Sequence, residues 1–263
     1  MPSDHAEGNI LLGRYCVRRL LGAGAHGRVY LAEDLGRGAR SVALKLVEDV
    51  AGATIADPAE QMLQTLRHPN WAAVLESGRT RPNGTYQVMR FVDGESLDRI
   101  DGPSSIELTY RLLEDGARVL RAVHDHGLIH YDVTPGNLIM EPGPAGPTFV
   151  LTDGGLAHVG PVANVARGTP MYMAPELTEK GEHDHRVDLY SLGLVAFRFL
   201  TGRDPIETDD AGEVFGRRRQ EDAPRASSIR DDVPAALDEL LASLLARLPN
   251  ERPADAHASV SYT

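Results

Sequence analysis

The order of apolar and polar positions divides the chain into a front part of short strands and a rear part of helices. Short apolar runs separated by turn residues predict strands over residues 15–21, 28–32, 42–47, 72–75 and 86–91. One helix is expected from Pro58 to Leu66, where Met62, Leu63 and Leu66 have helical spacing. The sequence His68-Pro69-Asn70 ends it, because a residue before proline avoids the helical region. The front part therefore predicts a small antiparallel sheet with one helix.

Helical spacing dominates the rear part. A long amphipathic helix is expected over residues 106–126, and a second over residues 235–248, opened by Pro234. Between them, residues 189–200 are apolar nearly all round, which predicts a buried helix. The best linker is Asp93-Gly94-Glu95-Ser96. The expected class is α+β: a mobile tail over residues 1–14, a front lobe over 15–92, a rear lobe over 93–263, and a cleft between the lobes.

Composition narrows the classes of protein to consider. In its 263 residues the chain has no apolar run of 18, and its first eight residues are polar, so a cytoplasmic protein without a membrane segment is expected. Cys16 is the single cysteine, which excludes an internal disulfide or a thiolate metal cluster. A net charge of −11 argues against a nucleic-acid partner. The one basic run, Arg217-Arg218-Arg219, is expected to form a solvated helix face rather than a substrate or nucleic-acid patch.

Lysine is rare in this chain, which makes one position informative. Of 27 basic residues only Lys45 and Lys180 are lysine. A compact ammonium can reach a phosphate where a planar guanidinium does not fit in the same way. Lys45 is therefore a candidate phosphate-binding residue.

A glycine-rich stretch precedes Lys45. Gly22-x-Gly24-x-x-Gly27 alone is compatible with an ordinary hairpin turn, and Glu48 stands about twenty residues later, where a dinucleotide-binding fold places a ribose-binding acid. That fold needs a helix to begin at the third glycine. Here residues 29–32 favour a strand, so a hairpin is expected whose backbone N–H groups can approach phosphates.

The middle of the chain combines carboxylates and an amide in loops. Asp132 and Asn137 lie five residues apart in a Pro-Gly loop flanked by apolar runs, and Asp153 stands on a glycine hinge after the apolar run Val150-Leu151. A single Asp or Asn in a loop is usually a turn residue. The agreement of these sites with the glycine hairpin and Lys45 favours a reaction that needs a base, a metal ion and a phosphate.

These segments, in this order, resemble the protein kinase family over residues 15–258, most closely bacterial Ser/Thr protein kinases. The resemblance implies ATP and Mg²⁺ as cofactors and a protein Ser/Thr hydroxyl as acceptor. It implies that Asp132 orients and deprotonates the acceptor hydroxyl and that Asn137 and Asp153 bind Mg²⁺. It also implies that Lys45 binds the α- and β-phosphates of ATP and that Met89 is the gatekeeper. The remaining ATP-binding residues that it implies are Leu21, Gly22, Ala23, Gly24, Ala25, His26, Gly27, Arg28, Val29, Ala43, Arg90, Val92 and Ile139. It also implies that residues 168–176 position the peptide substrate and that Arg252 pairs with Glu176.

Four positions depart from the family pattern. Tyr131 replaces the arginine that grips an activation-loop phosphate, and residues 154–167 contain no Ser, Thr or Tyr, so activity independent of phosphorylation in that loop is expected. Thr134 replaces a lysine, and Gly154 replaces a phenylalanine. Ala59 stands at the position where the family has the glutamate that pairs with Lys45, which leaves open whether Glu60 serves as the partner instead.

Two readings of the function follow. The first is an ATP- and Mg²⁺-dependent Ser/Thr protein kinase, and the second is a pseudokinase that acts as a nucleotide-binding scaffold or regulator. A small-molecule kinase is disfavoured by the peptide-positioning segment. The histidine pairs in His124-Asp125-His126 and His183-Asp184-His185 are expected at a helix end and in a surface loop rather than at a metal.

Overall fold

The computed structural model describes residues 7–24, 27–47, 58–80, 84–154, 157–159, 169–178, 183–208 and 210–256. The chain divides into two compact units. The first comprises Met1–Arg67 and Ala72–Asp93, and the second comprises His68–Trp71 and Gly94–Thr263. The main division falls between Asp93 and Gly94, inside the expected linker. The class is α+β, with a strand-rich first unit and a helix-rich second unit.

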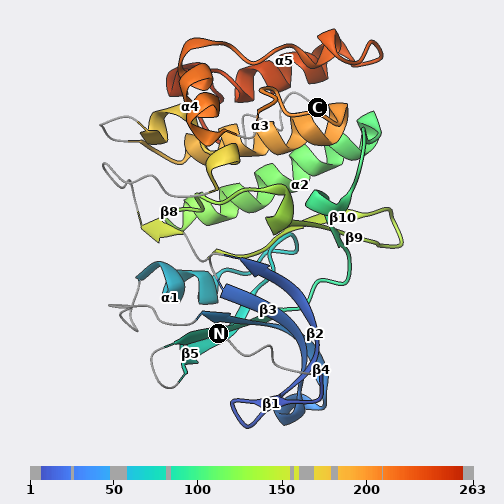
Figure 1. The fold of residues 1–263 in the computed structure, drawn as a ribbon, viewed down its shortest axis with the longest axis vertical. Coiled ribbons are helices and arrows are strands. Elements are labelled where there is room, and N and C mark those ends of the chain that lie inside the picture. The colour runs from blue at the N-terminus through green and yellow to red at the C-terminus, as the bar shows by residue number, and fades with distance from the viewer. Residues whose placement is uncertain are drawn as a thin grey trace. The chain divides into compact units, whose positions relative to one another are not determined.

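The first unit is built on an antiparallel sheet in the order β1-β2-β3-β4-β6-β5. Figure 1 shows β2, β3 and β4 as a strongly curled ribbon. On one face lies a core of Tyr15, Ala32, Val42, Leu44 and Val88, each at most 2% exposed. The predicted strands and the one helix are confirmed, with shifted ends. Their bounds are β1 (Ile10–Leu11), β2 (Tyr15–Gly24), β3 (Gly27–Asp34), β4 (Arg40–Val47), α1 (Pro58–Thr65), β5 (Val74–Arg79) and β6 (Thr85–Arg90).

The segment expected as a mobile tail is structured in its described part. Ile10 and Leu11 pair with Cys16 and Tyr15, so residues 7–14 add a short hairpin to the sheet. Arg14 fixes this hairpin by donating to both carboxylate oxygens of Asp34, at 2.6 and 2.7 Å. The sequence signal was missed because a two-residue strand has no measurable alternation.

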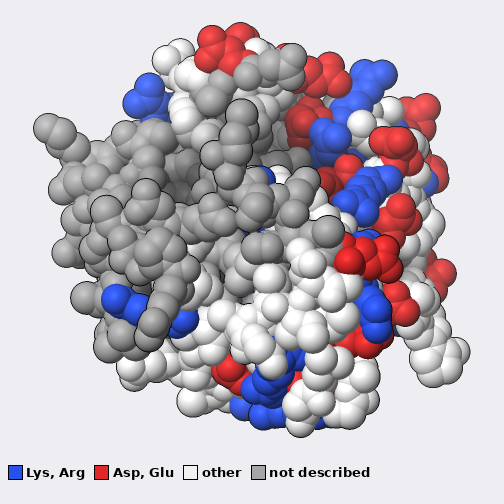
Figure 2. All heavy atoms as spheres, turned by 60° about the horizontal axis from the view of Figure 1, so that its bottom comes forward, with Lys and Arg blue, Asp and Glu red and all other residues white. Residues whose placement is uncertain are grey.

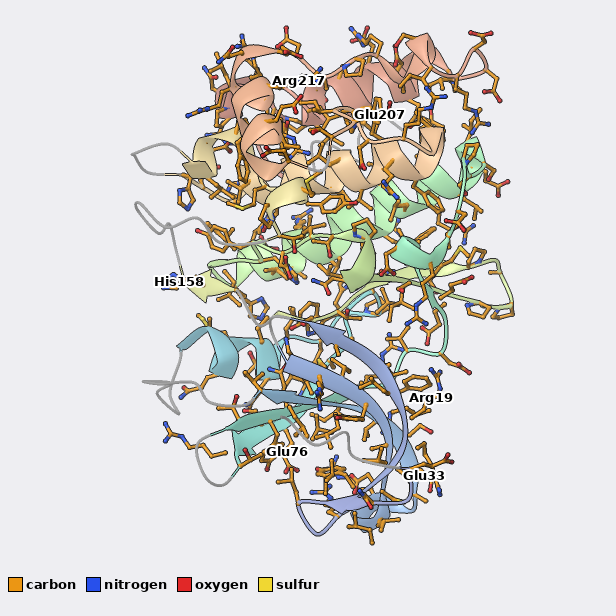
Figure 3. All side chains as sticks on the ribbon, in the orientation of Figure 1. Arg19, Glu33, Glu76, His158, Glu207 and Arg217 are labelled. Carbon is orange, nitrogen blue, oxygen red and sulfur yellow. The ribbon has the colours of Figure 1, made fainter. Side chains whose placement is uncertain are left out.

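Several arginine–carboxylate pairs lie on the described surface of this unit. Arg14 also donates to Glu76 at 2.9 Å, and Arg18 pairs with Glu33 at 2.5 Å (both acids are labelled in Figure 3). Figure 2 shows basic and acidic side chains intermingled on the face that it draws. Arginine and carboxylate charges therefore largely compensate each other locally.

The second unit is organised around two contacting helices, α2 (Ile106–Asp125) and α3 (Arg186–Thr201) (Figure 1). Ser105 caps α2 by accepting from Leu108 N at 3.1 Å, and Gly202, with a φ of 73°, ends α3. Helix α3 is buried on nearly all sides, as predicted. Helix α5 (Ala235–Leu244) packs against α3, whereas α4 (Ala211–Gln220) contacts the short turns Pro170–Tyr172 and Pro175–Thr178. Short strands complete the unit: β7 (Glu95–Ser96) pairs with β9 (Leu138–Glu141) and β9 with β10 (Thr148–Leu151), while β8 (Leu128–Ile129) pairs with β11 (His158–Val159).

One helix expectation needs adjustment. Helix α5 ends at Leu244 rather than at residue 248, and the carbonyls of Ala246 and Arg247 beyond its end accept from the Arg252 guanidinium at 2.8 and 3.1 Å. None of the helices in the described ranges is both long enough and apolar enough to cross a membrane.

Candidate active site

The glycine-rich stretch of the first unit is a hairpin, as predicted. Gly22, Ala23 and Gly24 on β2 face Val29, Arg28 and Gly27 on β3. Gly27 has a φ of 109°, and a Cβ there would lie 2.2 Å from the Leu46 carbonyl oxygen, so only glycine fits. Leu21 lies on β2 just before the glycines, whereas Ala25 and His26 lie outside the described residues.

The register of the sheet gathers four expected ATP-binding residues on one face. Val29 on β3 stands opposite Lys45 on β4, and Ala43, two residues before Lys45, stands opposite Met89 on β6. Side chains of directly paired residues, and of residues two apart on a strand, lie on the same face. This face is opposite to the core face around Leu44, and Lys45 is 5% exposed on it.

The expected adenine-reading backbone follows β6. Val92 is buried at 4% exposure just after the strand. The Arg90 N–H donates to the Ala73 carbonyl at 2.9 Å, so a contribution of Arg90 to nucleotide binding would have to come from its carbonyl. Ala59 is 2% exposed on α1, whereas the Glu60 side chain, its possible substitute as partner of Lys45, lies outside the described residues.

In the second unit the Asp132 carboxylate is held from two sides. Its Oδ2 accepts from the Asn137 side-chain amide at 2.9 Å, and the same amide nitrogen donates to the Asp132 carbonyl at 2.9 Å. Its Oδ1 accepts from both the hydroxyl and the N–H of Thr169, at 2.8 and 3.1 Å. The structure therefore brings Asp132 and Asn137 together, as their spacing predicted, and adds Thr169, which no spacing indicated.

Asp153 is linked to this group by a backbone hydrogen bond of the preceding residue, Thr152. Thr152 donates its N–H to the Asn137 carbonyl at 2.8 Å, which joins the end of β10 to the loop of Asp132. Asp153 then turns with a φ of 57°. A non-glycine residue in this left-handed region is uncommon and indicates a constrained position. Ile139, the expected adenine floor, lies on β9 opposite Val150.

Asp188, at the start of α3, supports the backbone of the loop. Its two carboxylate oxygens accept from the N–H groups of His130 and Tyr131 at 2.8 Å each, and His124 contacts Oδ2 at 2.8 Å. Burial alone would raise the pKa of Asp188, but these hydrogen bonds and the nearby histidines lower it. The charged Asp188 carboxylate therefore fixes the backbone of the loop just before Asp132.

Tyr131 takes a role that the sequence did not predict. Its φ is 64°, and its hydroxyl lies 3.0 Å from His183 Nε2, with the two rings edge to face. His183 is 8% exposed, so the expectation that it lies in a surface loop was wrong. His124, as expected, ends a helix, and His185 contacts the Ala254 carbonyl at 3.0 Å. In the described part of the chain, no group of three or more His, Cys, Asp or Glu side chains could hold a metal ion.

Residues 169–176, which we call the platform, follow in the second unit. At its end Arg252 donates to both oxygens of Glu176 at 2.6 and 2.8 Å, which confirms the predicted pair. Arg252 has 0% of its side chain exposed, so the pair is a buried clamp. The basic run on α4 is not a uniformly solvated face. Arg217, labelled in Figure 3, is partly exposed, whereas Arg218 is buried and donates to the platform.

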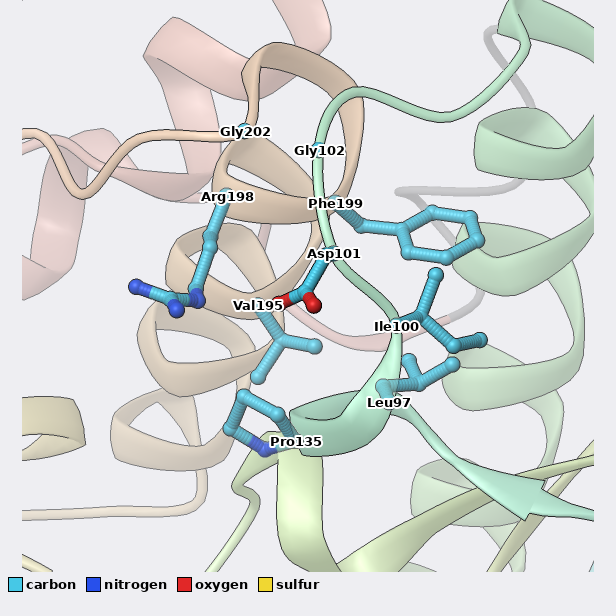
Figure 4. Close-up of a pocket in the computed structure, with 9 residues that line it drawn as sticks. All are labelled: Leu97, Ile100, Asp101, Gly102, Pro135, Val195, Arg198, Phe199 and Gly202. Carbon is cyan, nitrogen blue, oxygen red and sulfur yellow. The ribbon is translucent and has the colours of Figure 1, made fainter.

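A small pocket of about 100 Å³ lies beside Pro135, three residues after Asp132. Figure 4 shows Leu97, Ile100 and Phe199 clustered on one side and Arg198 on the other. Arg198 is engaged by Asp204 at 2.6 Å. The other walls of the pocket are formed by Asp101, Gly102, Val195 and Gly202.

Sequence reasoning missed the contacts of Thr169 and Tyr131's partner His183 with this site, and it missed the burial of Arg218 against the platform. Thr169 belongs to the segment that the resemblance singled out, so its hydroxyl beside Asp132 was within reach. Nothing local distinguishes Arg218 from Arg217 and Arg219, since only the packing of α4 decides which arginine is buried.

Comparison with known proteins identifies the fold. The sequence model of the protein kinase domain matches residues 15–261. The chain is similar to serine/threonine-protein kinase pkn3 of Myxococcus xanthus, at 30% identity over 97% of this chain and 50% of that protein. It is also similar to the DNA damage-responsive serine/threonine-protein kinase RqkA of Deinococcus radiodurans, at 32% identity over 94% and 38%. A third relative is serine/threonine-protein kinase PknB of Mycolicibacterium smegmatis, at 34% identity over 92% and 41%. The chain thus spans half or less of the length of these three relatives, and it belongs to the protein kinase family.

Proposed function

We propose that this chain transfers the γ-phosphate of ATP, with Mg²⁺, to a serine or threonine hydroxyl of a protein. The observation that carries the proposal is the Asp132 carboxylate, which is held at one oxygen by Asn137 and at the other by Thr169 of the platform. One carboxylate thus connects a candidate metal ligand to the segment expected to position a peptide. Phosphoryl transfer needs this kind of positioning more than covalent chemistry by the protein.

The first unit would bind the nucleotide. Val29, Ala43 and Met89 offer an apolar strip for adenine, and Lys45 on the same face offers an ammonium for the α- and β-phosphates. The glycine hairpin of β2 and β3 ahead of them has glycine at Gly22, Gly24 and Gly27, so few side chains would obstruct the approach of a phosphate to its backbone.

The second unit fits a magnesium ion. The Asn137 amide nitrogen is turned to Asp132, so its amide oxygen is the atom directed to other partners. This oxygen and the Asp153 carboxylate are hard ligands of the kind that Mg²⁺ prefers. When bound, Mg²⁺ neutralises charge on the transferred group. Asp132 would orient the acceptor hydroxyl and take its proton.

A protein acceptor is supported by the platform and by the pocket beside Pro135. Pro135, one of the residues that line this pocket, lies three positions after Asp132 along the chain. The pocket would receive a side chain close in sequence to the acceptor residue of a substrate. The relatives' names specify serine/threonine-protein kinases, which agrees with this acceptor class. ATP and a reduced Cys16 are both expected in the cytoplasm, where we propose that the domain acts.

Activity independent of activation-loop phosphorylation is part of the proposal. Residues 154–167 carry no hydroxyl side chain, and Tyr131, in place of a phosphate-gripping arginine, contacts His183 instead. The Thr169 hydroxyl is already donated to Asp132. A phosphate on Thr169 would place its charge against a carboxylate and would inhibit rather than activate.

The second candidate is a pseudokinase that binds nucleotide as a scaffold or regulator. The buried Ala59, at the helical position expected for the acidic partner of Lys45, favours it. Thr134, where a lysine is expected near the γ-phosphate, favours it as well.

Transfer of labelled phosphate from ATP and Mg²⁺ to a protein substrate separates the two candidates. Wild type should transfer phosphate, and Asp132→Asn and Asp153→Asn should each abolish transfer. Asp222→Asn is the matched control, because Asp222 is 85% exposed and pairs only with Arg247 among the described residues. Transfer that survives both active-site substitutions would refute the assignment. ATP binding without any transfer by wild type would establish the scaffold instead.

A further inference from the structure

Arg218 is a buried cation in the middle of α4. It is 3% exposed, whereas Arg217 keeps 39% of its side chain exposed and Arg219 is exposed. Val214, one helical turn earlier, is completely buried, so Arg218 lies on the inward face of the helix. An arginine on that face needs a reason other than solubility.

Stability alone does not supply the reason. In the described part of the chain Arg218 forms no ion pair with a carboxylate, since the nearby Asp204 pairs with Arg198 at 2.6 Å. The Arg218 Nε lacks a hydrogen-bond partner there. Burial lowers the pKa of Arg218, although Tyr190, Asp204 and Tyr172 partly offset this effect. A buried charge without a carboxylate partner is unfavourable, and a methionine would fill a similar volume without that penalty.

The hydrogen bonds of Arg218 to described residues go to the backbone of the platform. Nη2 donates to the Met171 carbonyl at 2.6 Å, and Nη1 donates to the Met173 carbonyl at 3.0 Å. Between them, the Ser191 hydroxyl on α3 donates to the Tyr172 carbonyl at 2.7 Å. Three consecutive carbonyls are therefore held by side chains of two helices. A planar guanidinium can span two carbonyls in this way, and a single ammonium cannot.

The two ends of the platform are held separately. At its start Thr169 contacts Asp132, and at its end Glu176 is clamped by Arg252. Arg218 holds the middle of the platform through the carbonyl of Met171, which lies only two residues after Thr169 along the chain. A shift of the Met171 carbonyl would therefore change the backbone that follows Thr169, where the acceptor peptide is expected to bind.

We propose that Arg218 is a positioning residue that keeps the platform in its substrate-binding form, and that it serves the protein substrate and not ATP. This inference rests on the proposed kinase activity. The platform is then ordered by helices α3 and α4 of the same unit, without a phosphate in the activation loop. A cation is retained inside the protein because its fork fixes a backbone that the acceptor protein must recognise.

Steady-state kinetics of Arg218→Met test the proposal, with the best peptide from a Ser/Thr peptide library as acceptor. We expect kcat/KM for the peptide to fall about 10- to 100-fold, while KM for ATP and ATP hydrolysis in the absence of peptide stay within about twofold of wild type. Arg217→Met on the same helix is the matched control and should behave as wild type. Arg218→Lys keeps the charge without the fork, so kcat/KM for the peptide should also fall, but less than in Arg218→Met.

Amide hydrogen exchange gives a second readout that needs no activity. Arg218→Met should increase exchange in residues 171–177 and leave α2 and α3 unchanged. Equal loss of ATP hydrolysis and peptide transfer, with a general rise in exchange, would mean that Arg218 is only structural. Wild-type peptide kinetics in Arg218→Lys would also overturn the proposal, even if Arg218→Met fails to fold. An inactive wild type would instead refute the kinase activity itself, and exchange would still report on the platform.

Discussion

Replacing Thr169 by valine removes a single hydrogen bond to the candidate base while keeping the shape of the side chain. The Thr169 hydroxyl donates to Asp132 Oδ1 at 2.8 Å. Valine keeps the branching at Cβ and nearly the same side-chain volume, so the backbone of the platform should not move. The Thr169 N–H, at 3.1 Å from the same oxygen, remains in place.

The size of the effect follows from the charge of the acceptor. A hydrogen bond to an ionised group contributes about 1.5–3 kcal/mol, which corresponds to about 13- to 160-fold in rate if it is lost fully in the transition state. The Thr169 N–H and the Asn137 amide still hold the two oxygens of Asp132. We therefore expect the lower end, about a tenfold fall in kcat for peptide phosphorylation.

The assay compares kcat and KM of wild type, Thr169→Val and Thr169→Ser with a saturating peptide and varied ATP. Serine keeps the donor and should stay within about threefold of wild type, and KM for ATP should not change in either variant. A kcat of Thr169→Val equal to that of wild type would refute the idea that the hydroxyl orients Asp132. An equal loss in Thr169→Ser would point to packing of the methyl group instead.

Two further predictions concern stability. Arg252→Met leaves the Glu176 carboxylate without its clamp, so the melting temperature should fall by roughly 6–20 °C, whereas Arg247→Met, which breaks an exposed pair with Asp222, should change it little; equal shifts would contradict this. Burial lowers the pKa of His183 from 6.5, against the opposing charges of neighbouring carboxylates. Because the unfolded chain then binds the proton more tightly, this stability is present above about pH 6.5 and is lost as the pH falls toward the lower folded pKa. Melting curves between pH 7.5 and 5.5 should therefore be less pH-dependent for His183→Gln, and an unchanged slope would contradict the assignment.

Local patterns predicted the elements well where burial is periodic or complete. The helices α2 and α3 follow from apolar spacing and from the apolar run before Gly202, and the strands of the first unit follow from short apolar runs between glycines. The short hairpin of residues 7–14 was not predicted, because it depends on Arg14 meeting Asp34 twenty residues later. Such a pair leaves no periodic signal.

The candidate site divides in the same way. Asp132 and Asn137 lie five residues apart, so their hydrogen bond depends on one loop, and sequence alone placed them together. The partners of that loop are separated from it by 37 positions in the case of Thr169 and by 52 positions between Tyr131 and His183. Which arginine of α4 is buried was likewise decided by the packing of the helix. The sequence thus determined the family, the elements and the chemical groups, because these depend on neighbours along the chain. Only the tertiary structure decided which groups hold Asp132 and the platform, because contacts between distant segments arise from packing that no local pattern records.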